Sequence, residues 1–569
     1  MLPHAVSIVT DCVYDEMEQA KPYFRISTDE VTPEFLVTWN IRDALSPLNM
    51  ARLFLTWSKI IEAATWSKNA EKNWHRSPEL GCKIVMVQVL HLRSVNCSKL
   101  QSMFGLFAWA HGVSHQVMEF LSHCSLSTSF TGTFNLLKSL ADKGIEKGRY
   151  IVVFIPHSLG YDNINLSMSI FVEQTGSESS PKLHGVRDRN HMLLSPILPH
   201  LHTATRFTMA EIRPTAQQRS LYMHQASISI VQTLLLYSPA FSSYERNQSQ
   251  LANIPQRPLP PNLCTKFYPL HVSTIEEASV QGNLRVHDDI YITQLKRKPS
   301  EMNTYAIPLF ADQLTNSRCH GCIIARAGDL TPWLKRQVFQ LGMGLFHLQM
   351  NLAWCILNKH RYSNGQVGGL SFFFTLLDKK RLNGKKPDYH TLTAALAQIH
   401  HGLLLDAWHV KCGKPSLAVF AQSNPTPADL LRIVRDILLD CACPPDVLLR
   451  ESGPPGNDDN EGSIPSDLDD SDDDAAPQQT ATNVPQDKSD PVHQNVQCLL
   501  RDLLYFEELT QAISSGDFGR LEDILPDLAA LFHSSGSNNY STEILHLLYN
   551  LKKVWTPEFA YVLQLIDKW

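Results

Sequence analysis

One segment of the chain alternates between apolar and polar side chains in the rhythm of a β-strand. Every second residue from Ile164 to Val172 is apolar, and polar residues occupy most of the positions between them. This two-residue period predicts a strand with one buried face. Asp162 is in phase with the apolar set, so we expect its carboxylate on the core side where the strand begins.

A second aspartate follows another strand-like run. Tyr305–Ala311 is short and mostly apolar, and Asp312 comes directly after it. We therefore expect Asp312 at the carboxyl edge of a sheet, which is the edge where open α/β sheets form their binding sites. The apolar run Arg149–Pro156 predicts a further strand, a neighbour of the one that follows Asp162.

Most of the remaining chain has apolar residues at helical spacing. The expected helices are 49–68, 83–92, 99–110, 113–124, 128–141, 215–237, 345–357, 388–409, 425–440, 496–514, 520–532 and 542–551. Ser127, Thr426 and Asp517 stand where side chains cap the starts of helices. The four helices between 83 and 141 fit a helix-turn-helix reader of DNA, although a small helical bundle is the favoured interpretation.

The composition is that of an ordinary globular protein. Of the 569 residues, 43% are hydrophobic and 19% are charged, and the length suggests roughly three or four domains. No apolar stretch approaches the roughly 18 residues that a membrane-spanning helix needs, so we expect no membrane partner. The start of the chain shows no secretory signal, and twelve cysteines without a spacing pattern suit an intracellular protein with reduced thiols.

Acidic residues are concentrated in one segment. The chain has a net charge of −6, but residues 451–490 hold twelve acidic residues and one lysine, so the remainder carries +5. The segment is rich in Gly, Pro, Ser and Gln, and we expect a disordered linker there. A mildly basic body permits nucleic-acid binding, which makes DNA a candidate partner.

The two aspartates are the strongest candidates for chemistry. Two carboxylates that converge at one sheet edge suit a divalent cation such as Mg²⁺ or Mn²⁺, because these ions prefer oxygen ligands. A two-metal phosphotransfer site uses about three carboxylates, and Glu543 is the first choice for the third. Asp406 and Asp388 are weaker choices. In the alternative interpretation, each aspartate only caps a turn or a helix.

Four further polar residues are expected to support these carboxylates without binding the metal. Asn163 and Gln313 directly follow the two aspartates. His347 and Asn351 lie one turn apart in an apolar helix, where a buried neutral imidazole needs a hydrogen-bond partner. Asn351 is the nearest partner for the His347 ring, and we expect His347 in the same pocket as Asp312.

Other motifs are less convincing as sites. Cys319 and Cys322 have the spacing of a zinc or redox motif, but no second pair of ligands follows at a suitable distance. The histidines between 390 and 409 lack a carboxylate to complete a metal-binding set, so we interpret them as core or surface residues. The chain also has no phosphate-binding glycine loop, no Gly-x-Ser-x-Gly elbow and no kinase signature.

Several short motifs resemble those of one protein family. They are Leu106-Phe107 before a His-Gly turn, Tyr161-Asp-Asn-Ile-Asn, Ala311-Asp-Gln-Leu-Thr, Gly344-Leu-Phe-His347, Pro387-Asp-Tyr-His390, and Gly516-Asp517 followed by Asn539-Tyr540. From about residue 80 to its end, the chain resembles a large fungal family of unknown function. Members commonly carry Gly-Asp before Gln-Leu-Thr, and some carry Gly-Asp before the aromatic-His pair. This chain has Ala311-Asp312 and Gly344-Leu345 at those places.

The resemblance implies a transposase-like origin. The family's layout of aspartates is similar to that of cut-and-paste transposases whose RNase-H-like core is split by a helical insertion, which is an analogy at the level of the fold. It implies a mostly α fold with a small α/β (RNase-H-like) core interrupted by helices, in which Asp162 and Asp312 are the first two metal-binding acids. Because an acid is missing at Leu345, the implied site is a degenerate one, in a nucleic-acid-associated protein of nuclear location.

The expected organisation follows from these patterns and the resemblance. It comprises an N-terminal helical segment (1–80), a helical bundle (81–145), an α/β core (146–325), a helical insertion (326–445), a disordered acidic linker (446–492) and a C-terminal helical segment (493–569). A competing hypothesis is a non-catalytic helical protein-interaction or scaffold protein. It is motivated by the many apolar helices and the acidic linker.

Overall fold

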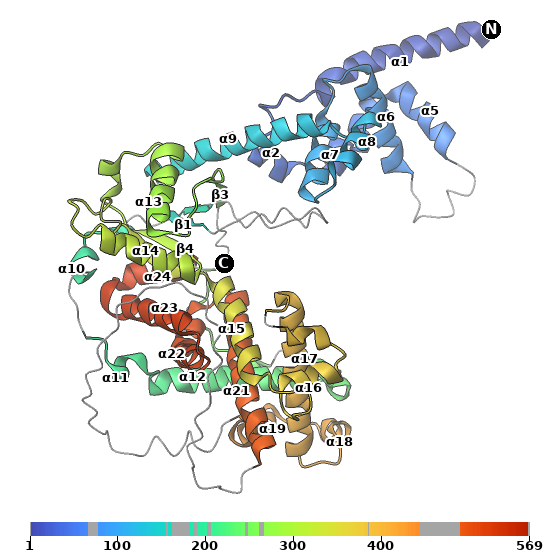
Figure 1. The fold of residues 1–569 in the computed structure, drawn as a ribbon. Coiled ribbons are helices and arrows are strands. Elements are labelled where there is room, and N and C mark those ends of the chain that lie inside the picture. Colours follow the sequence, from blue (N-terminus) through green and yellow to red (C-terminus); the bar gives the residue numbers. More distant parts are fainter. Residues whose placement is uncertain are drawn as a thin grey trace. The chain divides into compact units, whose positions relative to one another are not determined.

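The computed structural model describes residues 2–66, 78–154, 157–161, 182–185, 190–201, 206–244, 248–260, 267–384, 386–442 and 490–566. The protein is mostly helical with one small sheet (Figure 1), which confirms the expected predominance of helices around a small α/β part. The chain divides into two compact units. Unit 1 comprises Met1–Leu194, Thr265–Ala311 and Ser317–Gln340, and unit 2 comprises Ser195–Cys264, Asp312–Asn316 and Leu341–Trp569.

Unit 1 contains the N-terminal helices and the sheet. Its helices are α1 (Leu2–Phe24), α2 (Pro33–Thr38), α3 (Ile41–Ala44), α4 (Pro47–Leu53), α5 (Leu55–Thr65), α6 (Glu79–Arg93), α7 (Lys99–Ala110), α8 (His115–His123), α9 (Phe130–Phe154) and α13 (Val280–Asp288). Its strands are β1 (His157–Gly160), β2 (Lys182–Gly185), β3 (Phe267–Pro269) and β4 (Ile307–Ala311). The boundary between the units falls within α14 (Gln313–Ala325) and β5 (Phe339–Met343).

The sheet is mixed and has the strand order β3-β2-β1-β4-β5. Strand β1 is antiparallel to β2 and parallel to β4, with Leu159 opposite Leu309 and Gly160 opposite Phe310. Leu159 and Leu309 are both fully buried, so the parallel pair lies at the centre of the sheet's core. A parallel pair needs a crossover connection, and the chain between β1 and β4 supplies one of more than a hundred residues.

Two local predictions in unit 1 were wrong. The run from Arg149 was expected to be a strand, but α9 continues through it to Phe154. The expected cap Ser127 lies outside the helix, and the Ser129 hydroxyl accepts the hydrogen bond from the Gly132 N–H at the start of α9 instead. The strand expected over 164–172 lies outside the described residues.

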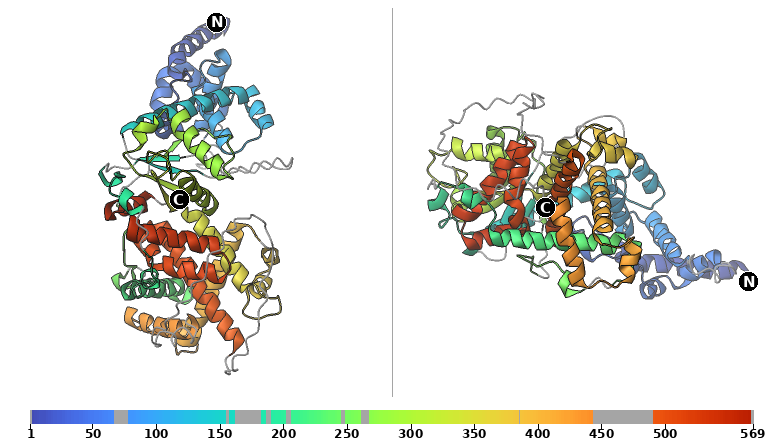
Figure 2. Two further views of the ribbon diagram at one scale, coloured as in Figure 1. Left: turned by 60° about the vertical axis from the view of Figure 1, so that its left-hand side comes forward. Right: turned by 90° about the horizontal axis from the view of Figure 1, so that it is seen from below.

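Unit 2 contains the remaining helices. They are α10 (Leu198–Leu201), α11 (Met209–Ile212), α12 (Ala216–Tyr237), α15 (Leu345–His360), α16 (Leu370–Leu376), α17 (Tyr389–Lys411), α18 (Leu417–Gln422), α19 (Pro427–Ile437), α21 (Pro491–Ser515), α22 (Phe518–Ser534), α23 (Asn538–Tyr549) and α24 (Pro557–Ile566). The expected caps Thr426 and Asp517 both accept hydrogen bonds from their helix starts. Helices α21, α22 and α23 lie side by side (Figure 2). The acidic linker lies almost wholly outside the described residues.

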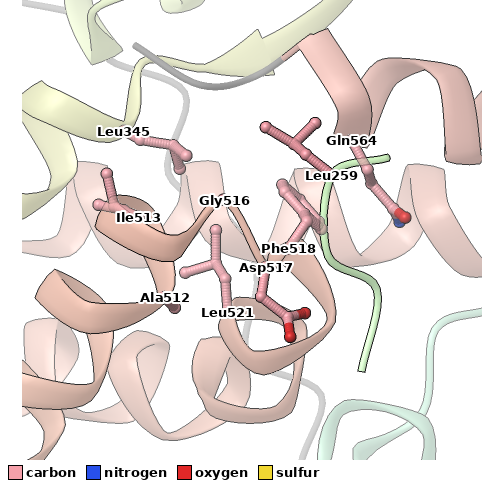
Figure 3. Close-up of a pocket in the computed structure, with 9 residues that line it drawn as sticks. All are labelled: Leu259, Leu345, Ala512, Ile513, Gly516, Asp517, Phe518, Leu521 and Gln564. Atoms are coloured by element: carbon pink, nitrogen blue, oxygen red, sulfur yellow. The ribbon is translucent and has the colours of Figure 1, made fainter. Parts of the chain in front are cut away.

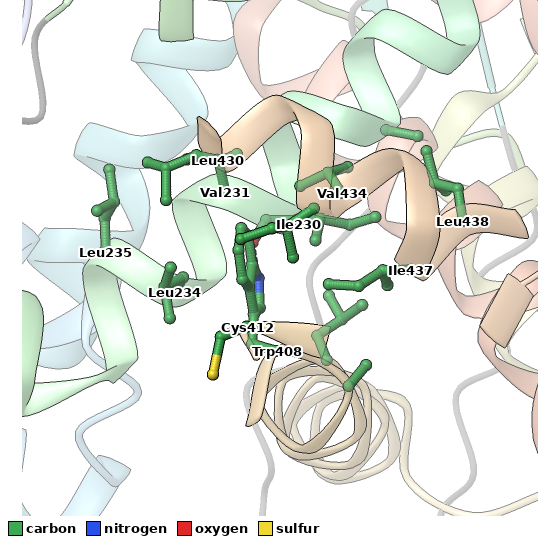
Figure 4. Close-up of a cluster of buried hydrophobic side chains, with 14 of the residues drawn as sticks. Ile230, Val231, Leu234, Leu235, Trp408, Cys412, Leu430, Val434, Ile437 and Leu438 are labelled. Carbon is green, nitrogen blue, oxygen red and sulfur yellow. Dashed lines mark hydrogen bonds between the residues drawn. The ribbon is translucent and has the colours of Figure 1, made fainter. Parts of the chain in front are cut away.

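One hydrophobic core of unit 2 joins α12, α17 and α19. Trp408 is fully buried among aliphatic side chains of these helices, including Leu234 and Val434 (Figure 4). Its indole N–H donates to the Ile230 carbonyl at 3.0 Å, so the polar atom of the ring is satisfied inside the core. Within the described residues, every helix is too short or too polar to cross a bilayer.

The turn between α21 and α22 is fixed by Asp517. Gly516 ends α21 with a φ of 65°, and the Asp517 carboxylate caps α22 through the Arg520 N–H. The same carboxylate accepts hydrogen bonds from the backbone N–H groups of Gln256 and Arg257, both at 2.8 Å. Apolar side chains such as Leu259 and Phe518 close around this turn (Figure 3) and leave a cavity of only about 10 Å³. The Gly516-Asp517 motif is therefore structural, since it ties a distant loop to the start of α22.

Gly519→Ala should destabilise unit 2, by about 1–3 kcal/mol as an overpacking substitution. An added Cβ would lie 2.4 Å from the Gln256 Cβ and 2.9 Å from the Arg257 backbone nitrogen. Gly402→Ala is the matched control, because Gly402 lies in α17 with nothing within 4 Å of its added Cβ. It should stabilise the protein by up to about 1 kcal/mol through helix propensity. Urea denaturation of both variants checks the opposite signs, and stabilisation by Gly519→Ala would contradict the close approach.

Candidate functional site

Asp312 lies where the sequence placed it, directly after β4 and before α14. Its Oδ1 atom accepts a hydrogen bond from the Thr315 N–H at 2.7 Å, so it caps α14 as the alternative interpretation predicted. Asp312 is only half-buried. In the described part of the chain its other carboxylate oxygen makes no hydrogen bond, and so the cap leaves one charged oxygen for a ligand.

Asn316 lies one turn after Asp312 on α14 and is fully buried. Its Nδ2 atom donates to the Gly342 carbonyl at 2.9 Å and to Glu543 Oε1 at 3.0 Å. These two acceptors define the orientation of the amide. The Asn316 Oδ1 atom is then a buried acceptor without a hydrogen-bond partner among the described residues.

Glu543, the expected third acid, is close enough to Asp312 for their charges to interact. Burial raises the pKa of Glu543 to about 7, the Asn316 hydrogen bond lowers it, and the charge of Asp312 raises it again. A carboxyl group in this setting exchanges its proton near neutral pH. When Glu543 ionises, its charge repels that of Asp312, and a bound cation would relieve this repulsion.

Asp312, Asn316 and Glu543 themselves offer oxygen donors, and a ring nitrogen of His546, on the same helix as Glu543, lies within 4.8 Å of the Glu543 carboxylate. Two carboxylates and a buried amide oxygen are the ligands that Mg²⁺, Mn²⁺ and Ca²⁺ prefer. The unsatisfied Asn316 Oδ1 supports this fit, because a buried acceptor without a partner carries a desolvation penalty that a cation would remove. The residues present therefore fit the expected divalent cation.

Asp162 and Asn163 lie outside the described residues, so the structure does not place them. Asp162 comes two residues after Gly160, and Asp312 comes two residues after Phe310. Gly160 and Phe310 are partners in the parallel ladder of β1 and β4. The two aspartates thus hold equivalent sequence positions after neighbouring parallel strands.

The end of β1 is fixed by the buried hydroxyl of Tyr161. It donates to Asn283 Oδ1 at 2.7 Å and lies 2.9 Å from His287 Nε2 and 3.3 Å from Cys319 Sγ. Burial, together with the charge of Arg336, lowers the pKa of His287 to about 3, so its ring is neutral. This network explains Cys319 as a structural residue.

Cys322 has a different environment from Cys319. Its thiol donates to the Val280 carbonyl at 3.3 Å, and burial raises its pKa to about 11. The two sulfurs of the C-x-x-C motif therefore contact separate partners.

The His347 and Asn351 motif has a structural partner. The Asn351 amide donates to the His347 carbonyl at 2.9 Å and to the Tyr540 hydroxyl at 2.7 Å. The two printed donations of the Asn351 amide go to groups other than the His347 ring, and the expected bond between Asn351 and that ring stays a prediction. Asn351 thus links the carbonyl of His347, in the family-like motif on α15, to Tyr540, in the motif on α23. Whether His347 shares a pocket with Asp312 stays a prediction.

Sequence reasoning missed Asn316. The spacing of four residues from Asp312 puts the two side chains on one face of α14, and this signal was available. Gln313, expected as a supporting residue, is half-buried at the first position of α14.

The comparisons with known proteins give one finding. A model of a family described as a family of unknown function (DUF6589) matches residues 202–565. The matched region contains Asp312, Asn316 and Glu543 but not Asp162. No curated protein and no solved structure matches the chain.

Proposed function

The chain belongs to the family of unknown function DUF6589, and we propose that it is a transposase-derived, nucleic-acid-associated protein with a metal-dependent phosphotransfer site around Asp312. The observation that carries the proposal is the meeting of Asp312, Asn316 and Glu543. Two carboxylates beside a buried amide oxygen are typical of sites that bind a divalent cation for phosphoryl transfer.

Each residue has a distinct part in this proposal. Asp312 supplies a charged ligand at the end of β4, and Asn316 both positions Glu543 and offers its own oxygen. Glu543 would serve as the third acid once it has lost its proton, and Asp162 remains the other metal-binding acid that the sequence predicts. Mg²⁺ or Mn²⁺, when bound, would polarise a phosphoryl oxygen and lower the pKa of a bound water molecule.

Asp312→Asn and Glu543→Gln should each weaken Mn²⁺ binding by about tenfold or more, because each removes a charged oxygen ligand. In the wild-type chain, binding should strengthen as the pH rises through about 7, since a proton must leave Glu543 first. Glu543→Gln should abolish this pH dependence. Asp312→Asn should move it to lower pH, because the Asp312 charge helps to raise the pKa of Glu543. Isothermal titration calorimetry of the full chain at several pH values measures these effects.

Asp388→Asn is the matched control for this experiment. Asp388 is an exposed acid that caps α17 through the Thr391 N–H, and asparagine is an equally good cap. Its Mn²⁺ affinity should equal that of the wild type. Unchanged Mn²⁺ binding in both site variants would remove the proposed site and leave the non-catalytic helical interaction protein as the better hypothesis.

Binding to DNA separates the two hypotheses further. The full chain should retain a labelled duplex at low salt and lose it steeply as salt rises, because phosphate contacts release counterions. With Mn²⁺ present, any nicking should disappear in Asp312→Asn. No retention of nucleic acid at low salt would contradict the nucleic-acid association itself.

A further inference from the structure

A second cluster of metal-ligand side chains lies elsewhere in unit 2, on helices α17 and α21. His400 and His401 are consecutive residues near the middle of α17, and Glu507 lies on α21, which packs against α17. One ligand atom of each residue lies within 4.8 Å of those of the other two. The sequence around these histidines shows no carboxylate that completes a metal-binding set. The packing of α21 against α17 brings the carboxylate of Glu507 close to them.

His400 is the most constrained member of the cluster. Its side chain is 2% exposed, and its Nε2 atom has no hydrogen-bond partner among the described residues. A buried imidazole nitrogen without a hydrogen-bond partner is costly by itself, and binding of a metal ion would satisfy it.

The other two ligands are held in place by neighbouring side chains. The His401 ring stacks on Tyr237, with the ring centroids 4.4 Å apart. Glu507 Oε1 accepts a hydrogen bond from Gln511 Nε2 at 2.8 Å. Such partners orient metal ligands and limit the rotamers they adopt.

We propose that His400, His401 and Glu507 form a binding site for a divalent transition-metal ion, with Zn²⁺ as the first candidate. Two imidazoles and one carboxylate are a ligand set of zinc sites that keep a fourth position open. This set of two imidazoles and one carboxylate differs from the ligands proposed around Asp312, which are two carboxylates and an amide oxygen. The two sites should therefore take different metals, and this one does not depend on the proposed phosphotransfer function.

The cluster adjoins a cavity that can hold the fourth ligand. The cavity has a volume of about 280 Å³, and its lining includes His400, Glu507, Tyr389, Gln349 and Thr510. Gln349 Nε2 donates to the Thr510 hydroxyl at 2.8 Å, so polar groups line one part of the cavity. A water molecule from this cavity completes the coordination of the metal.

The three ligand atoms need to move only a short distance to bind one zinc ion. Tetrahedral zinc with bonds of about 2.1 Å brings ligand atoms to roughly 3.4 Å from one another. The ligand atoms start from separations of at most 4.8 Å, so rotations of the side chains achieve this without moving the helices.

The test is titration of the metal-stripped full chain with Zn²⁺, followed by Co²⁺ as a spectroscopic probe. The wild type should bind one equivalent at this site, and Glu507→Gln and His401→Asn should each weaken that binding by about tenfold or more. His409→Gln is the matched control, because His409 is an exposed histidine on the same helix, and it should bind as the wild type does. The Co²⁺ complex should show nitrogen and oxygen ligation without a thiolate charge-transfer band.

Further variants and a stability measurement separate this proposal from its alternatives. Asp312→Asn should keep the Zn²⁺ site, so loss of one site is distinguishable from loss of the other. Zn²⁺ should raise the melting temperature of the wild type. Glu507→Gln should still show a melting transition, which demonstrates that it is folded, but Zn²⁺ should not raise its melting temperature, because the variant lacks the site. A thiolate band, or Zn²⁺ binding that Glu507→Gln leaves unchanged, would overturn the proposal.

Discussion

Replacing Asp502 with alanine should lower the free energy of unfolding of unit 2 by about 3–5 kcal/mol, the usual cost of breaking a buried ion pair. The Asp502 side chain on α21 is 1% exposed. Its carboxylate lies 2.8 Å from His360 Nε2, 2.9 Å from Lys359 Nζ and 2.8 Å from an Arg501 nitrogen. Without Asp502, these groups would converge on one another with no opposite charge between them.

The same contacts give this stabilisation a defined pH dependence. Burial alone would raise the pKa of Asp502, but the His360 hydrogen bond and the nearby positive charges lower it to about 2. An unfolded aspartate titrates near about 3.9, so the folded state holds fewer protons than the unfolded state between these two values. The stabilisation is therefore complete above pH 4 or so and is lost as the pH falls toward about 2.

Urea denaturation of wild type and Asp502→Ala at several pH values measures this difference. The difference in unfolding free energy between the two proteins should be largest near neutral pH. It should narrow as the pH falls from about 4 toward about 2. Asp440→Ala is the control, because the Asp440 side chain is 59% exposed in its ion pair with Lys411. Exposed pairs contribute about 1 kcal/mol or less. A loss of that size in Asp502→Ala would contradict the buried-charge argument.

Glu508→Ala should be similarly destabilising, by about 3–5 kcal/mol, because it leaves a buried guanidinium without its counter-ion. Glu508 and Arg520 are each 3% exposed. They form two parallel hydrogen bonds, from Arg520 Nε at 2.8 Å and from Nη2 at 2.7 Å. Gln511 Oε1 also accepts from Nη2, at 3.3 Å, but a neutral amide does not balance the charge.

The double variant Glu508→Leu with Arg520→Met tests this explanation. Replacing a buried ion pair with apolar side chains of similar volume is often neutral or stabilising, so the double variant should recover most of the stability lost in Glu508→Ala. Melting temperature and urea denaturation of the variants measure the recovery. If the double variant is no more stable than Glu508→Ala, the loss comes from packing and not from the unpaired charge.

The sequence predicted the helices of unit 2 well because their signals are local. Asp388, Thr426 and Asp517 cap the helices they precede, and each contacts a backbone N–H three residues later. Apolar spacing of 3.6 residues and a capping side chain both act within one or two turns, so neither depends on the rest of the fold.

Local pattern reading failed most clearly at the end of α9. The run of β-branched and aromatic residues from Tyr150 to Phe154 suggested a strand. In the structure it extends a helix of 25 residues, in which Ile151 and Val152 are buried while Tyr150 and Phe154 are exposed. An established helix adds each further residue at little cost, so continuation overrides a modest β propensity.

The candidate sites show the division between sequence and tertiary structure most clearly. The sequence by itself placed Asp312 at the end of a strand and Glu543 on a helix, because strand ends and amphipathic helices leave local patterns. Only the tertiary structure joined Glu543 to Asn316 and Glu507 to His400, since these partners lie on helices far apart in the chain. Helix packing is driven by the burial of apolar faces, and this driving force is non-directional. The polar residues that the packing brings together therefore carry no sequence pattern that would predict their contact. The partners of a buried charge are therefore decided by the packed fold, and the residues on either side of that charge do not encode them.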